Sequence, residues 1–135
     1  LSKKLKIRNV DFMGRKSPQY IMEMMSQCDI GLGIFGDTEK AKRVIPHKAF
    51  EVIASRKPLV TGDSRALREL FTPNIDCYAC DFGNEKSIAK SIEFLMSNPK
   101  ILNKISKEGY KTYLEYCTPE VIGAELKLAM ENLLY

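Results

Sequence analysis

The apolar residues of this chain follow two periods, and the change from one to the other predicts its secondary structure. Short apolar runs bounded by glycine or proline indicate strands, whereas apolar residues spaced three and four apart indicate helices. The predicted strands span residues 10–13, 29–35, 59–61 and 76–80. Helices are predicted to begin at Pro18, with Ser17 as N-cap, and to span residues 46–56, 65–71, 85–97, 99–116 and 118–134.

Strands and helices alternate in this prediction until the last strand, after which only helices follow. Such an order predicts an α/β fold, a Rossmann-like, doubly wound parallel sheet with C-terminal helices. Ligands of these sheets bind outside the carboxyl ends of the strands. We therefore expect Gly14 and Arg15, the polar loop 36–43 and residues 46–48 to converge on one cleft.

The helix predicted to begin at Pro46 has the pattern most suggestive of a binding site. Proline suits the first helical turn, because its missing N–H has no partner there in any case. Lys48 and Glu51 lie on a different face from the apolar stripe around Ile53. A helix N-terminus, a lysine and a carboxylate at one edge of a sheet are suited to holding a phosphate and a compound with hydroxyls.

The glycines of the second predicted strand formally match G-x-G-x-x-G at residues 31–36. A dinucleotide fingerprint opens a helix after its strand, but these glycines lie within the strand. Glycine in a strand usually marks a bulge or a close approach of backbone. We therefore do not interpret this match as a cofactor site. The methionines of the helix that begins at Pro18 are likewise interpreted as core residues.

Composition narrows the class of protein. The 135 residues are 44% apolar and 28% charged, as in a globular domain with a real core, and no apolar run reaches the length of a membrane span. The net charge of +4 is too small to favour nucleic acid, but it suits anionic small molecules or an anionic membrane surface. The chain opens without methionine, so we expect it to be part of a longer protein.

Four cysteines raise the question of a metal or redox site. Cys77 and Cys80 have C-x-x-C spacing, but no second pair follows and His47 is the only histidine. In a strand, residues three apart point to opposite faces. We interpret the cysteines as reduced thiols in a structural role and expect no metal.

Residues 46–59, PHKAFEVIASRKPL, resemble the P-x-K-x-x-E-x-x-A-x-G-x-P-V block of GT-B glycosyltransferases of the group 1 (family 4) type. The preceding DIGLGIFG and the following Arg68-Glu69-Leu70 also match, and the resemblance covers nearly the whole chain. It implies that residues 1–135 are a partial nucleotide-sugar (donor) binding domain. Such enzymes transfer a sugar from a nucleoside diphosphate to an acceptor hydroxyl.

The resemblance also implies roles for particular residues. The glutamate that matches Glu51 binds the ribose hydroxyls, and backbone N–H groups near His47 and Lys48 would face the diphosphate. Backbone near Gly14 and Arg15 would lie against the nucleobase. Enzymes of this fold generally need no bound metal and no cofactor other than the donor substrate.

Three departures from the family pattern affect these expectations. Arg43 stands where the E-x7-E motif has its first glutamate, so it could reach a phosphate or the sugar. Arg56 stands where the family usually has glycine. The first two strands of the domain, with a basic pair that clamps the diphosphate, and the acceptor domain have no counterpart here. We therefore expect residues 10–13 not to pair directly with residues 30–35 and the chain alone to be inactive.

The function predicted on this basis is that of a glycosyltransferase of polysaccharide or glycolipid synthesis. The expected partners are a nucleotide sugar and an N-terminal acceptor domain of the same protein, with no nucleic acid. The expected location is the cytoplasm, with possible peripheral association at the inner face of the cell membrane. The alternative is a non-catalytic nucleotide-binding module that shares the fold.

Overall fold

The computed structural model describes residues 8–133 and contains three strands among them. The strands are β1 (Gly31–Leu32), β2 (Leu59–Gly62) and β3 (Tyr78–Cys80). The α-helices are α1 (Pro18–Gln27), α2 (Glu39–Lys42), α3 (His47–Ala54), α4 (Glu85–Ser97), α5 (Pro99–Thr112) and α6 (Pro119–Leu133). A 3₁₀ turn, η1 (Leu67–Glu69), follows β2, and a π-helical turn, η2 (Tyr113–Cys117), continues α5.

The sheet is parallel with strand order β1-β2-β3, which confirms the predicted α/β class. Leu32 pairs with Val60, and Val60 pairs with Tyr78. Beyond β1, the Gly33 N–H donates to the Val60 carbonyl at 2.8 Å and the Gly62 N–H donates to the Ile34 carbonyl at 2.9 Å. The central strand β2 is therefore bonded on both edges and buried along its whole length.

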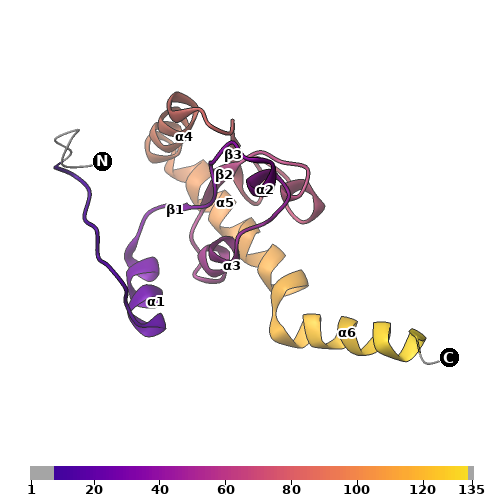
Figure 1. The fold of residues 1–135 in the computed structure, drawn as a ribbon. Helices are drawn as coiled ribbons and strands as arrows, with labels where there is room; N and C mark the ends of the chain where they lie inside the picture. Colours follow the sequence, from indigo (N-terminus) through magenta and orange to yellow (C-terminus); the bar gives the residue numbers. More distant parts are fainter. Residues whose placement is uncertain (1–7, 134–135) are drawn as a thin grey trace.

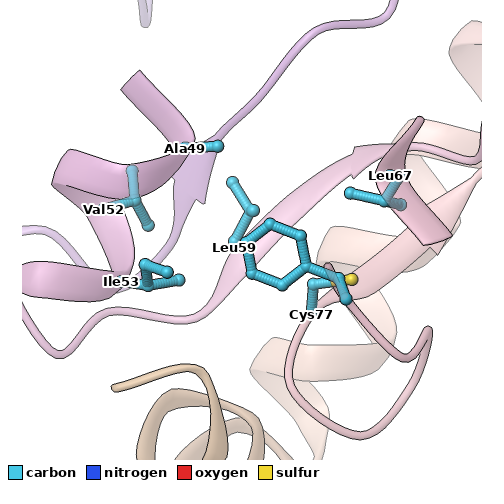
Figure 2. Packing of buried hydrophobic residues seen from close by; sticks show 7 residues of the cluster. Ala49, Val52, Ile53, Leu59, Leu67 and Cys77 are labelled. Carbon is cyan, nitrogen blue, oxygen red and sulfur yellow. The ribbon is translucent and has the colours of Figure 1, made fainter. Parts of the chain in front are cut away.

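Two apolar clusters cover the two faces of the sheet. Figure 2 shows the first, in which side chains of α3 meet Leu59, Leu67 and Cys77. The second joins Val60 and Cys80 to α4 and α5. Successive residues of a strand point to opposite faces, which places Leu59 in one cluster and Val60 in the other. The predicted opposite orientation of Cys77 and Cys80 is confirmed in the same way.

Gly31 lets α3 approach β1 closely. A Cβ atom at this position would lie 2.3 Å from a methyl carbon of Val52 on α3. The close backbone approach expected from glycine in this strand is therefore present.

The strand predicted at residues 10–13 does not form. The segment has no strand pairing among the described residues, and Val10, Phe12 and Met13 are 47%, 78% and 46% exposed. A short apolar run becomes a strand only when a neighbouring strand satisfies its backbone groups. The expectation that it does not pair with residues 30–35 holds, but the predicted strand itself is wrong.

Several other element predictions differ in detail. Of the strand predicted at 29–35, only Gly31–Leu32 forms β1. Pro46 is the N-cap of α3 rather than its first helical residue, because its ψ of 146° is extended. Only Leu67–Glu69 of the helix predicted at 65–71 is helical, as a 3₁₀ turn. The polar loop 36–44 contains the short helix α2, whose N-cap Thr38 accepts a hydrogen bond from the Ala41 N–H at 3.1 Å. The long helix predicted at 99–116 ends in the π-helical turn η2.

The first and last helices lie at the periphery. Figure 1 shows α1 and α6 extending away from the sheet and the helices around it, on different sides of the molecule. Neither helix has a fully buried residue. Met22 and Met24 of α1 are exposed, whereas Met25 is half-buried and packs against the first apolar cluster, so the interpretation of the α1 methionines as core residues holds only for Met25. Within residues 8–133, no helix has the length and apolar character needed to cross a membrane.

Candidate functional site

The N-terminus of α3 is open. Pro46 has no side-chain acceptor to cap the helix, and its carbonyl accepts the Ala49 N–H at 2.8 Å. The N–H groups of His47 and Lys48 have no hydrogen-bond partner within residues 8–133, and both residues are exposed. Two free N–H groups at the positive end of a helix dipole can accept an anion.

Glu51 lies one turn further along α3. Its Oε1 is 3.2 Å from Nδ1 of His47, an i,i+4 contact that becomes an ion pair when the imidazole is protonated. The side chain of Glu51 is 44% exposed and can still accept hydrogen bonds from solvent or a ligand. The sequence left open whether Lys48 is the partner of Glu51. In the structure His47 takes that place, and Lys48 has no ion pair within the described residues.

A pocket of about 260 Å³ is lined by Glu51 of α3 and by residues of α1. Its other lining residues are Pro18, Ile21, Met22, Met25, Ala54 and Ser55. The carboxylate thus stands at the edge of a largely apolar recess between α1 and α3. The contribution of α1 to this pocket was not predicted, although the five apolar residues among positions 20–25 were the available signal.

Gly14 lies beside a second pocket, of about 360 Å³, on the other side of α1. It has a φ of +65°, a backbone conformation that glycine adopts without strain, and nothing lies within 4 Å of a Cβ atom placed there. Ile21 and Met25 line both pockets, so α1 forms the wall between them. Arg15 is exposed and lines neither pocket.

Arg43 is the C-cap residue of α2, three residues before Pro46. Its guanidinium lies 3.7 Å from a carboxylate oxygen of Glu39, and its side chain is 77% exposed. Arg43, His47 and Lys48 line neither of the two pockets. The structure therefore places the predicted residues in three neighbourhoods, namely the α3 N-terminus with Glu51, the loop at Gly14, and the α2 C-terminus.

Two of the four cysteines, Cys77 and Cys80, have the properties of structural thiols. Cys77 is fully buried, and loss of solvation raises the pKa of its thiol to about 12. Burial also raises the pKa of Cys80, whose thiol lies 3.4 Å from the Thr61 carbonyl. A protonated, inaccessible thiol is neither a nucleophile nor a metal ligand. No group of three or more potential ligands that could hold a metal ion occurs within residues 8–133.

Comparison with protein families gives one match. A model described as "Glycosyl transferases group 1" matches residues 1–112, which is most of the chain. No curated protein sequence matches this chain.

Several solved structures share the fold. A sucrose-phosphate synthase from Thermosynechococcus elongatus is similar with a TM-score of 0.83 and 14% identity over 98% of this chain and 32% of the other. Anabaena HepE, crystallised with UDP-glucose, has a TM-score of 0.77 and 17% identity over 99% of this chain and 35% of its own. The C-terminal domain of the group 1 glycosyl transferase LpcC from Francisella tularensis has a TM-score of 0.65 and 18% identity over 87% of this chain and 59% of its own. The chain thus spans about a third of the length of the first of these proteins and of HepE.

Proposed function

Because this chain belongs to the group 1 glycosyl transferases, we propose that it is part of the donor-binding domain of such an enzyme. The enzyme transfers a sugar from a nucleoside diphosphate to an acceptor hydroxyl in polysaccharide or glycolipid synthesis. HepE has been crystallised with UDP-glucose and with UDP, so a uridine nucleotide sugar is the first donor to test.

One observation carries the proposal: the uncapped N-terminus of α3 is followed after one turn by a half-exposed carboxylate. Two N–H groups, of His47 and Lys48, are free to donate to the diphosphate. Glu51 can accept two hydrogen bonds from the vicinal hydroxyls of a ribose. A ligand bound to both would lie along the first turn of α3, and the recess between α1 and α3 begins at Glu51.

The chemistry assigned to this chain is stabilisation of the leaving diphosphate. Negative charge develops on the diphosphate as the bond to the sugar breaks, and hydrogen-bond donors fixed in advance at that place lower the barrier. His47 and Lys48 supply N–H groups from a rigid helix, and Lys48 adds a positive charge. Arg43 precedes this turn, and its guanidinium is exposed. It would reach a phosphate or the sugar once its ion pair with Glu39 is broken. The nucleobase would lie near Gly14 and Arg15, and no cofactor other than the donor substrate is required.

The remaining part of the site belongs to the rest of a longer protein. The solved relatives named first carry about two thirds of their length outside the matched region. We place an acceptor-binding domain there, and we place the enzyme in the cytoplasm, with peripheral association at the inner face of the cell membrane. The exposed apolar side chains of α6, such as Leu126 and Leu133, are available for contact with such a domain.

The proposal is tested by isothermal titration of the full-length protein with a panel of nucleotide sugars, together with a variant. Glu51→Gln keeps the shape of the side chain but removes its charge and one acceptor. It should weaken nucleotide binding by about 1–3 kcal/mol. The melting temperature should be nearly unchanged, because the side chain is half exposed.

Glu93→Gln is the matched control, because Glu93 is an exposed glutamate on α4, away from α3. It should bind the nucleotide as the parent does. Equal affinities of parent and Glu51→Gln would remove Glu51 from the site, and failure of every nucleotide sugar to bind would contradict the proposed function.

A further inference from the structure

A third cavity, of about 330 Å³, lies at the opposite end of α3 from His47. It is formed by the turn after α3 and by one face of α5, and its lining residues are Arg56, Asn103, Ser106, Lys107, Tyr110 and Lys111. Arg56 lies nine positions after His47, which corresponds to roughly 13 Å along a helix. This cavity is therefore distinct from the proposed nucleotide site.

Arg56 has a backbone conformation that disfavours its own side chain. Its φ is +55°, in the left-handed region where only glycine is free of strain. The resemblance to the group 1 enzymes places glycine at this position. A non-glycine residue with this backbone conformation is a reason to look for a function of its side chain.

Two contacts hold Arg56 in place. The Ser106 hydroxyl donates to the Arg56 carbonyl at 2.6 Å, which fixes the strained peptide against α5. The guanidinium carbon lies 4.3 Å from the centre of the Tyr110 ring, at cation–π distance. Stacking leaves the edge of the guanidinium, with its N–H donors, free to meet a ligand.

Positive charge at the cavity exceeds negative charge. Lys111 pairs with Glu108, with both carboxylate oxygens at 2.8 Å, and this contact lowers the pKa of Glu108, as do the charges of Lys107 and Lys104. Arg56 and Lys107 have no carboxylate at ion-pair distance anywhere in the described part of the chain. Two uncompensated cations thus face one cavity, with the amide of Asn103 as a neutral donor.

We propose that this cavity binds a phosphate group. A phosphate monoester carries close to two negative charges and offers several acceptor oxygens, which match two free cations and an amide donor. Arginine binds two such oxygens with its planar fork, and lysine adds a point charge. The phosphate can belong to a small soluble phosphate ester or to the headgroup of an anionic lipid, and the experiment separates these sources.

The test titrates the full-length protein with glycerol 3-phosphate and separately sediments it with two kinds of vesicle. One vesicle is phosphatidylcholine alone, and the other contains one part in five of phosphatidic acid. Arg56→Gly removes the guanidinium and relieves the backbone strain, so the variant should remain folded, with a melting temperature close to that of the parent. It should bind phosphate about tenfold more weakly, the effect of losing one charged hydrogen bond. Nucleotide affinity should be unchanged.

Lys100→Gln is the matched control, since it removes one positive charge from α5 outside the cavity lining. If Arg56→Gly weakens the binding of glycerol 3-phosphate and Lys100→Gln does not, the ligand is a soluble phosphate ester. The same pattern seen only with phosphatidic acid vesicles identifies a lipid headgroup. The proposal is overturned if neither probe binds, or if both variants lose affinity equally. Glu51→Gln separates the two sites, because it should change nucleotide affinity and leave phosphate ester binding at α5 unchanged.

Discussion

The strand β2 and the segment 10–13 are both short and partly apolar in sequence, LVTG and VDFM, but only the first forms a strand. Leu59 and Val60 are fully buried, whereas Phe12 is 78% exposed. β2 is bonded to β1 on one edge and to β3 on the other, and it is covered by α3 on one face and by α4 and α5 on the other. Residues 10–13 have none of these neighbours within residues 8–133.

The difference shows that strand formation in this protein depends on partners rather than on local preference. An unpaired extended segment leaves its N–H and C=O groups to water and gains nothing from the ladder. β-propensity mostly reports how well a side chain fits a partly buried pleated surface, and residues 10–13 have no such surface. We therefore expect mutations in the two segments to have very different effects on stability.

The largest effect should be that of Leu59→Ala. Leu59 lies at the centre of the first apolar cluster with no exposed surface, so its truncation opens a cavity (Figure 2). Such changes cost about 2–5 kcal/mol. Phe12→Ala removes a larger side chain, but an exposed one, and should change the free energy of unfolding by less than about 0.5 kcal/mol. Urea unfolding of both variants measures the contrast.

A comparable loss from Phe12→Ala would contradict this interpretation. It would show that residues 10–13 pack against the rest of the protein in solution and that the Phe12 side chain is not exposed there.

The parts of the fold that could be predicted are those where local pattern and packing agree. The helices α3, α4, α5 and α6 have apolar residues at helical spacing, and the boundaries of α4 were predicted without error. Proline and serine or threonine marked the starts of α1 and α6. The short elements were less predictable, because α2 and η1 depend on single contacts such as the Ser64 hydroxyl that accepts the Leu67 N–H.

The candidate site was predictable where it depends on one helix. The open turn at His47 and Lys48 and the carboxylate at Glu51 follow from the order of residues in α3 alone. The pairing of Glu51 with His47 rather than Lys48 depends on side-chain conformations, which sequence spacing leaves undecided. The recess beside Glu51 and the cavity at Arg56 each combine residues from two helices that are distant in sequence, and only the folded chain brings them together.

A second, smaller contrast concerns two helical glycines. A Cβ atom at Gly109 of α5 would lie 2.7 Å from the Asp76 carbonyl oxygen and 3.1 Å from a side-chain carbon of Ile53. Gly109→Ala should therefore lower the free energy of unfolding by about 1–2 kcal/mol, because backbone cannot yield without a cost. Gly123 of the peripheral α6 has nothing within 4 Å of that position. Gly123→Ala should stabilise the protein by about 0.5–1 kcal/mol through helix propensity.

Thermal unfolding of these two alanine variants would give shifts of opposite sign. Shifts of the same sign would show that α6 packs against something in solution that limits the space beside Gly123.

The smallest expected effect concerns Asp76, the buried carboxylate that precedes β3. Its two oxygens accept hydrogen bonds from the Thr72 N–H at 2.8 Å and the Thr112 hydroxyl at 2.9 Å. Loss of solvation nevertheless outweighs these bonds and raises its pKa, and the nearby charge of Glu108 acts in the same direction. In the folded state, the Asp76 carboxyl therefore stays protonated to a higher pH than it does in the unfolded chain.

The pH dependence follows from that preference. Between the ordinary aspartate pKa of about 3.9 and the raised value, the folded protein binds more protons at Asp76 than the unfolded chain does. The stabilising contribution of the protonated carboxyl is complete below the ordinary pKa and is lost as the pH rises through the raised one. Asp76→Asn keeps an acceptor for the Thr72 N–H and removes the charge. Its amide NH2 group would donate to the Thr112 hydroxyl, which can itself donate to the Glu108 carbonyl at 3.3 Å. The free energies of unfolding of parent and variant are measured in urea from pH 4 to pH 7. The value of the parent minus that of the variant should fall as the pH rises. A difference that rises with pH would mean that the two hydrogen bonds stabilise the ionised carboxylate more than burial destabilises it.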